Sequence, residues 1–199
     1  MGLSNTDLHI ILDAVIFATG KHHGQVRKDQ QHSPYITHPL TVAQVILNIG
    51  DVSDLTILTA AILHDTIEDT CTNNSEIQDR FGNQVLNLVL EVTDDKSLPK
   101  MERKRLQVVH APHLSIPARI LKLGDKLVNC RDIILSPPED WDLNRRQEYL
   151  QWSADVVYYL RGANHDLENA FHALLSEAEH TLGFKLQPIT TIQNRPWAP

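Results

Sequence analysis

The octapeptide LHDTIEDT, residues 63–70, concentrates side chains capable of acid–base or metal chemistry. His64, Asp65, Glu68 and Asp69 directly follow the apolar run LTILTAAIL. If the helix of that run continues, residues four apart share one face, so His64 lies beside Glu68 and Asp65 beside Asp69. Burying such groups without partners is costly because charged groups lose their hydration. A divalent cation bound by His64 and Asp65 removes this cost and leaves Glu68 and Asp69 free for proton transfer.

Two neighbouring residues cannot complete the coordination shell of a metal ion, so other ligands must come from distant segments. His38 precedes a proline in PYITHPL, at an expected helix start. Asp125 stands in LKLGDKLVNCRD, within a helix otherwise rich in leucine and isoleucine. On composition alone Asp125 is an ordinary surface residue, but beside a His-Asp doublet the metal interpretation is favoured. We therefore predict that His38, His64, Asp65 and Asp125 share one metal ion.

Two basic segments could attract a polyanion to such a site, namely KHHGQVRK (21–28) and KMERKR (100–105). Each segment alone is more simply a solvated surface. Beside a metal site, Lys100 with Arg103 or Lys104 could neutralise phosphate groups. Tyr149, in RRQEYLQW, could form a wall of such a site, whereas Trp152 is expected in the core.

Composition limits the classes of partner. The chain has 199 residues, a formal net charge of −7 and two cysteines. An acidic protein is a poor nucleic-acid binder by bulk electrostatics, so no nucleic-acid partner is expected. No apolar run approaches the roughly 18 residues of a membrane span, and the N-terminus lacks a signal pattern. We expect a cytoplasmic protein with free thiols and no membrane partner, and its oligomeric state stays open.

Helical periodicity dominates the chain, and no convincing alternating strand pattern occurs. These patterns predict one all-α domain over residues 1–183, a bundle of roughly eight to ten helices. The prolines in KLQPITTIQNRPWAP indicate an extended tail over 184–199. The helices are expected at about 6–19, 39–49, 53–64, 74–80, 83–91, 100–109, 116–135, 142–161 and 165–182.

The spaced set H…HD…D is typical of HD-domain metallophosphohydrolases. HDTIEDT resembles the HDxxED form of hydrolase domains of the RelA/SpoT type. GQVRKDQQHSPYITHP, EVTDDKSLPKMERKRLQ and KLGDKLVNCRD extend this resemblance, and with RRQEYLQWSADVV they cover most of residues 8–180. The sequence is similar to the small alarmone hydrolases, which are stand-alone SpoT-like enzymes. In long relatives a synthetase domain follows the hydrolase; synthesis is not expected here.

This resemblance implies roles for individual residues. His38, His64, Asp65 and Asp125 align with the metal ligands of the family, whose ion is usually manganese. Glu68 and Asp69 align with its catalytic acidic pair, although Asp69 could instead support a ligand histidine. Arg27 and Lys28 match a basic doublet at the nucleotide site, and Asn129 matches a ribose-side asparagine. The irregular KHHGQ and QQHS segments leave the base contacts open.

The activity implied is metal-dependent removal of the 3′-pyrophosphate from alarmone nucleotides such as (p)ppGpp, as in the bacterial stringent response, giving GDP or GTP and pyrophosphate. A hydrolase of the same fold acting on (p)ppApp or on the 2′-phosphate of NADPH is an alternative. A non-catalytic alarmone-binding module is a second alternative. Such a module could lose Glu68, Asp69 or a metal ligand, whereas all of these residues are present. General acid–base groups typically contribute about 10²–10⁴-fold to a rate.

Overall fold

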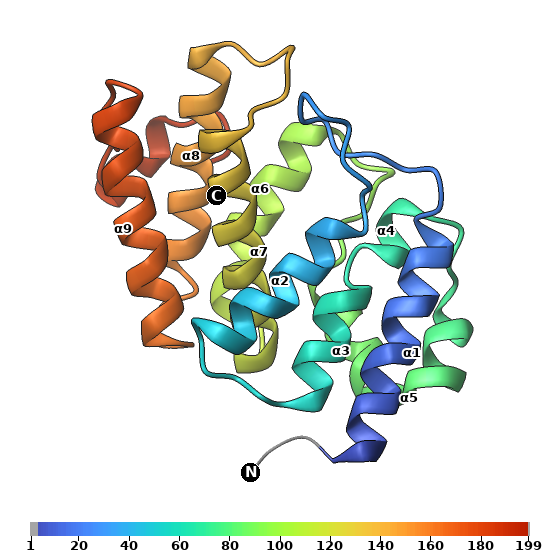
Figure 1. Cartoon of the computed structure of the whole chain (residues 1–199). Helices are drawn as coiled ribbons and strands as arrows, with labels where there is room; N and C mark the ends of the chain where they lie inside the picture. Colours follow the sequence, from blue (N-terminus) through green and yellow to red (C-terminus); the bar gives the residue numbers. More distant parts are fainter. Residues whose placement is uncertain (1–3, 199) are drawn as a thin grey trace.

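The computed structural model describes residues 4–198. Within these residues the regular secondary structure consists of helices, and there is no β-strand (Figure 1). One isolated bridge joins Val26 to Pro34 in the loop before the second helix. The expected all-α bundle is therefore confirmed. Its helices are α1 (Asn5–Lys21), α2 (Thr37–Asn48), α3 (Leu55–Leu63), α4 (Thr66–Asp69), α5 (Asn74–Val92), α6 (Lys100–His110), α7 (Ile116–Leu135), α8 (Leu143–Tyr158) and α9 (His165–Thr181), with 3-10 helices η1 (Ala111–His113) and η2 (Ile189–Asn194).

Local sequence signals explain where several helices begin and break. Ser4 and Asp7 form a capping box at α1, and the Ser115 side chain accepts the Ala118 N–H at the start of α7. Gly82 interrupts α5 with a φ of +85°, which separates the two helices expected at about 74–80 and 83–91. Glycine adopts this left-handed region without the steric cost that other residues meet.

Helix α7 is the centre of the bundle. It packs against α2, α3 and α5 on one side and against α8 and α9 on the other, as Figure 1 shows. Every residue from 120 to 128 is buried, including Lys122, Asp125 and Lys126. A helix enclosed on all sides is normally apolar, because unpaired buried charges are costly. The buried charged residues of α7 therefore indicate a functional site at this part of the helix.

Helices α2 and α7 approach closely at Gly124. A Cβ atom built at this position would lie 2.7 Å from Cγ1 of Ile46, which is shorter than any ordinary carbon contact. The absence of a side chain at position 124 therefore lets α2 and α7 pack together. Asp125 follows directly on α7, and His38 lies in the first turn of α2.

The helix of the LTILTAAIL run does not continue through the polar cluster, contrary to our expectation. Helix α3 ends at Leu63, and α4 starts at Thr66. The Thr66 hydroxyl donates a 2.6 Å hydrogen bond to the Leu63 carbonyl, and such local side-chain bonds compete with regular helix. His64 and Asp65 thus occupy the junction between the two helices. The i to i+4 bond from the Asp69 N–H to the Asp65 carbonyl survives at 2.8 Å.

Residues 185–198, here called the C-terminal segment, fold back on the bundle. We expected an extended tail over 184–199, but the described part contains η2 and buries Ile192 and Trp197. Residues 1–3 and 199, at the outer ends of the predicted domain and tail, lie outside the described residues. Within the described part, none of the helices combines the length and the apolar character that crossing a membrane requires.

Candidate active site

His38, His64, Asp65 and Asp125, here called the His/Asp cluster, meet in the interior of the bundle. They come from α2, the α3–α4 junction and α7. His38 Nε2 lies 3.2 Å from Asp125 Oδ1, and His64 Nε2 lies 3.2 Å from Asp65 Oδ1. One ligand atom each from His38, His64 and Asp65 falls within a span of 4.8 Å. The structure thus brings together all four residues that the sequence suggested as metal ligands.

The side chains of this cluster are held in place by hydrogen bonds. His64 Nδ1 bonds the Ala61 carbonyl at 2.7 Å, which turns Nε2 toward the carboxylates. That Nε2 is buried and has no hydrogen-bond partner among residues 4–198. Asn129 donates to Asp125 Oδ1 at 2.5 Å, and the Tyr35 hydroxyl donates to Asp65 Oδ2 at 2.7 Å. Metal-binding histidines and carboxylates are typically oriented by such outer partners, so the cluster fits a divalent ion.

The electrostatics of the cluster favour positive charge. Burial opposes a charge on His64, but the neighbouring Asp65 and Asp125 carboxylates outweigh burial and raise the His64 pKa to about 9. Burial would raise the pKa of Asp125, yet the imidazoles of His38 and His64, whose Nε2 atoms lie 3.2 Å and 3.8 Å from its Oδ1, hold that pKa well below its usual range. A group of carboxylates that stays ionised inside a protein requires a cationic partner. A metal ion can be that partner.

Glu68 and Asp69 lie on α4, one turn beyond the cluster. Glu68 accepts the Asp94 backbone N–H at 2.9 Å, and Asp69 accepts the Tyr35 hydroxyl at 3.1 Å. Lys96 contacts both acids, at 2.6 Å from Asp69 Oδ1 and 3.2 Å from Glu68 Oε1. Burial raises the pKa of Glu68 above its usual value, in spite of the Asp94 hydrogen bond. Glu68 can therefore hold a proton more readily than an exposed glutamate, as a general acid or base requires.

A cavity of about 320 Å³ adjoins the His/Asp cluster and the two acids of α4. The His/Asp cluster, Glu68 and Asp69 line one part of it. Basic side chains from other segments line another part, and we call them the cationic wall. Its members are Lys28, Lys100, Arg103, Lys104 and Arg145.

A second cavity of about 410 Å³ adjoins the first and shares several lining residues with it, among them Lys28, Asn129 and Tyr149. Arg27 lines this second cavity but not the first. Its guanidinium group donates to Asp132 Oδ2 at 2.6 Å, and it lies 5.7 Å from the Tyr35 ring centroid. The two cavities therefore adjoin, and His38 of the His/Asp cluster lines both of them.

The predicted substrate residues occupy different parts of this space. Lys28, Lys100, Asn129 and Tyr149 line the first cavity, and Arg27 lines the second. Within KMERKR the structure resolves which side chains face inward. Lys100, Arg103 and Lys104 line the first cavity, whereas Arg105 pairs with Glu102 at 2.7 Å. Lys21, in the other basic segment, pairs with Glu76 at 2.5 Å and lines neither cavity.

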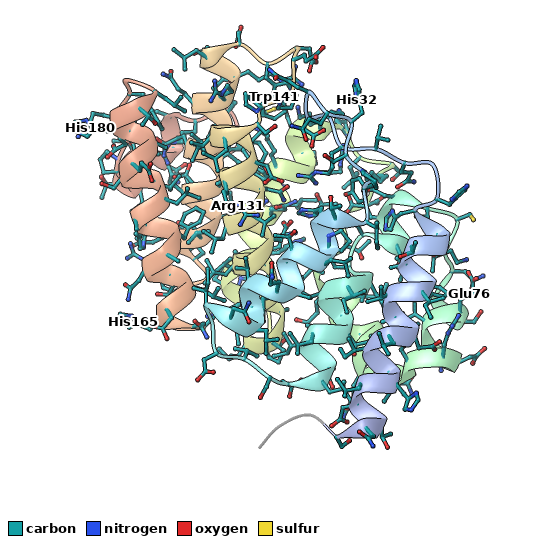
Figure 2. All side chains as sticks on the ribbon, in the orientation of Figure 1. His32, Glu76, Arg131, Trp141, His165 and His180 are labelled. Carbon is teal, nitrogen blue, oxygen red and sulfur yellow. The ribbon has the colours of Figure 1, made fainter. Side chains whose placement is uncertain are left out.

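Sequence reasoning missed several residues of the site. Arg145 and Trp141 line the first cavity beside Lys100, and the Arg145 guanidinium lies 4.4 Å from the Trp141 ring centroid. Figure 2 shows Trp141 at the same end of the bundle as His32, far from His165. Lys126 could have been found from the sequence, because it is a charged residue in an otherwise apolar helix. Its ammonium lies 3.8 Å from the Trp152 ring centroid, and burial lowers its pKa to about 8. Trp152 is buried, as expected, but it also lines the cavity.

The sequence was compared with protein families and with individual proteins of known function. The HD domain family matches residues 14–150. The chain is 53% identical over 164 residues to the guanosine-3′,5′-bis(diphosphate) 3′-pyrophosphohydrolase MESH1 of Xenopus tropicalis, covering 82% of this chain and 92% of the relative. The enzyme of the same name from Homo sapiens is 49% identical, over 86% and 96% of the two chains.

A solved structure is also similar. It belongs to "a metazoan ortholog of SpoT" that "hydrolyzes ppGpp and plays a role in starvation responses", and it superimposes with a TM-score of 0.84 at 38% identity. The superposition covers 89% of this chain and 98% of that structure.

Proposed function

The chain belongs to the HD domain family, and we propose that it is a metal-dependent hydrolase that removes the 3′-pyrophosphate from (p)ppGpp. The relatives at 53% and 49% identity carry this activity in their names, and each is covered almost completely by the match. The products are GDP or GTP and pyrophosphate. The assignment of individual roles below is part of the proposal.

The observation that carries this proposal is the division of charge within one cavity. The carboxylates and imidazoles of the His/Asp cluster line this cavity together with seven basic side chains, namely the five of the cationic wall and Lys122 and Lys126 of α7. The protein as a whole has a net charge of −7, so the wall is a local reversal of the overall field. Two buried donors, Arg103 Nε and Trp141 Nε1, have no hydrogen-bond partner in the part of the chain that the structure describes. Such donors suit the oxygens of a nucleotide carrying several phosphates.

Manganese is the proposed ion. The His/Asp cluster offers imidazole nitrogen and carboxylate oxygen, and this mixed set suits a divalent first-row metal such as Mn²⁺. A metal ion bound by His38, His64, Asp65 and Asp125 would polarise a phosphoryl oxygen and lower the pKa of a water molecule.

The acidic pair handles the protons of the reaction. Water oxygen bonds to the phosphorus next to O3′, the bond from that phosphorus to O3′ breaks, and O3′ takes up a proton. Glu68, whose pKa burial raises, is the proposed proton carrier. Asp69 is fixed between the Tyr35 hydroxyl and the Lys96 ammonium, so it is proposed to orient the attacking water.

The nucleoside part of the substrate is proposed to extend toward the second cavity. Asn129, Tyr149 and Lys28 line both cavities and lie where the ribose would pass. Arg27 is held by Asp132 and can present its planar guanidinium to a purine base. The cationic wall would then bind the 5′-phosphates.

Hydrolysis of ppGpp by the purified protein with added Mn²⁺ tests the proposal, with products separated by anion-exchange chromatography. We expect GDP and pyrophosphate in equal amounts, and no turnover by His64→Ala. Parallel assays with ppApp and NADPH test the two alternative substrates. A higher kcat/KM for either of them than for ppGpp would contradict the guanine alarmone as the preferred substrate. Binding of ppGpp without any turnover would indicate a sensor rather than an enzyme.

A further inference from the structure

The C-terminal segment lies beyond residues 14–150, which the HD domain family matches. It is nevertheless fixed to the bundle by backbone hydrogen bonds. The Leu186 N–H donates to Glu179 Oε1 on α9 at 2.6 Å, and the Gln187 N–H donates to Gln151 Oε1 on α8 at 2.7 Å. In Figure 1 the segment, drawn in dark red, runs beside these two helices. It is an ordered part of the structure with a defined place.

A buried carboxylate anchors the end of this segment. Asp155 on α8 is only 2% exposed and accepts the Trp197 indole N–H at 2.8 Å. It also forms an ion pair with Arg195, whose guanidinium donates to the Gln187 carbonyl at 2.7 Å. A buried charge that loses such partners is strongly destabilising. Asp155 therefore fixes both the position and the orientation of the Trp197 ring.

The Trp197 ring faces a lysine of the active-site cavity. Lys104 Nζ lies 5.1 Å from the centroid of Trp197, 4.9 Å from that of Trp152 and 5.9 Å from that of Tyr149. Trp152 is itself fixed, because its indole N–H donates to the Lys104 carbonyl at 3.0 Å. An ammonium within about 6 Å of an aromatic centroid is attracted by the electron-rich face of the ring. These three rings form an aromatic cage around one ammonium group.

Lys104 needs this support because its surroundings disfavour a fixed cation. It is half-buried and shares the cavity with Lys100 and Arg145, which repel it. Burial and these neighbours, against the opposing charge of Glu148, lower its pKa to about 8. A lysine side chain is also long and rotates freely, so holding it in one place costs conformational entropy. The rings favour the charged form and restrict its motion.

We propose that Trp197 is a positioning residue of the enzyme: held by Asp155, it completes an aromatic cage that keeps the Lys104 ammonium in the cavity, where this group binds phosphate of the nucleotide. This inference rests on the proposed function of the cavity. It assigns the C-terminal segment a part in substrate binding. Trp197 acts through Lys104 and makes no contact with the reacting atoms.

Steady-state kinetics on the full-length, Mn²⁺-loaded enzyme with ppGpp test the cage. Trp197→Leu keeps apolar bulk but removes the aromatic face, so KM should rise about 3- to 10-fold with kcat within about two-fold. In a Lys104→Met background, Trp197→Leu should have no further effect on KM. Phe184→Leu is the matched control, because Phe184 is an aromatic residue next to the same segment without a cation–π contact to Lys104. An equal rise of KM in both backgrounds, or no rise, overturns the proposal.

A second set of variants avoids any loss of folding. Tryptophan analogues with increasing numbers of fluorine atoms, placed only at position 197, keep the shape and the N–H but weaken the negative potential of the ring face. KM should rise stepwise along the series. A constant KM across the whole series overturns the proposal, because packing alone would explain Trp197.

Binding measurements separate this inference from the proposed function. Calorimetry with GDP and, separately, with inorganic pyrophosphate needs no turnover. Trp197→Leu should weaken binding of at least one of the two about 3- to 10-fold relative to wild type. If wild type does not hydrolyse ppGpp but shows this difference, the proposed function fails and the cage stands. Equal affinities of wild type and variant for both probes overturn the cage, whatever the enzyme hydrolyses.

Discussion

The His/Asp cluster and the cationic wall line the same cavity but are built differently. The cluster consists of short side chains, of which His64, Asp65 and Asp125 are each held by a neighbouring hydrogen bond. The wall consists of long, half-buried or exposed cations on α6, α8 and the loop before α2, several of them stacked on aromatic rings. Short fixed side chains suit bond making, and long cations suit the holding of phosphates.

This contrast predicts two kinds of kinetic effect. An interaction that changes as bonds break affects kcat, whereas one made equally in the ground and transition states affects KM. We expect variants of the cluster and of the acidic pair to lower kcat. Variants of the cationic wall are expected to raise KM.

The largest effect is expected for the cluster itself. His64→Ala removes a proposed metal ligand, so the protein should lose its metal and at least about 10³-fold of its turnover. Elemental analysis of the purified variant and a ppGpp assay measure both. His165→Ala is the matched control, because His165 is exposed on α9 at a distant end of the bundle (Figure 2). Full metal occupancy in His64→Ala would show that the ion, if bound, uses other ligands.

Glu68→Gln is expected to have the next largest effect. The amide keeps the shape but cannot carry the proton, so kcat should fall about 10²- to 10⁴-fold while metal content stays near that of wild type. Glu177→Gln, an exposed position on α9, controls for the loss of one charge. Loss of metal in Glu68→Gln would make this residue a ligand, and a near-normal kcat would remove it from the acidic pair.

Substitutions in the cationic wall are expected to change KM. Lys28→Ala and Lys100→Ala would each remove one proposed phosphate contact, so KM for ppGpp should rise about 3- to 10-fold with little change in kcat. Lys21→Ala is the control from the same basic stretch, because Lys21 pairs with Glu76 away from both cavities. If both wall variants keep the wild-type KM, these lysines are solvated surface and the contrast between the two regions disappears.

The smallest expected effect is a pH dependence of the wall. The pKa of Lys104 is lowered to about 8 by burial, so its ammonium is present below this pH and is lost as the pH rises. Between pH 7 and 9 the charged fraction of such a group falls from about nine-tenths to about one-tenth. Arginine stays charged over this range. The kcat/KM of wild type divided by that of Lys104→Arg should therefore fall about 3- to 5-fold from pH 7 to pH 9. A flat ratio would contradict a Lys104 ammonium that binds phosphate and loses its proton between pH 7 and 9.

The sequence alone was enough to predict which residues form the His/Asp cluster, because each of them stands out in its own local segment. A His-Asp doublet after an apolar run, a histidine before a proline and a lone aspartate in an apolar helix each stand out. The helical periodicity also predicted the bundle that joins them. The break between α3 and α4 was not predicted, because the helix expected over 53–64 was assumed to continue through the polar cluster. It depends on the hydrogen bond of one threonine with the end of the preceding turn.

The wall could not be derived in the same way because its pairs are distant in the chain. Arg145 and Trp141 gain their role only when α8 lies beside α6. Arg103 and Arg105 are two residues apart on one helix, yet one faces the cavity and the other pairs with Glu102. Trp197 stands among prolines that indicate an extended tail. Its place follows from Asp155, more than forty residues earlier in the chain.

The close contact at Gly124 has a consequence for the choice of ion. The separation of α2 and α7 sets the distance between His38 and Asp125, and that separation depends on a missing methyl group opposite Ile46. Metal sites discriminate between ions partly by geometry and cavity size. An alanine at position 124 would force Ile46 or α2 to move, and a movement of α2 would separate the two proposed ligands, His38 and Asp125. Ion selectivity can therefore drift in evolution, or be redesigned, through a residue that has no side chain and touches no metal.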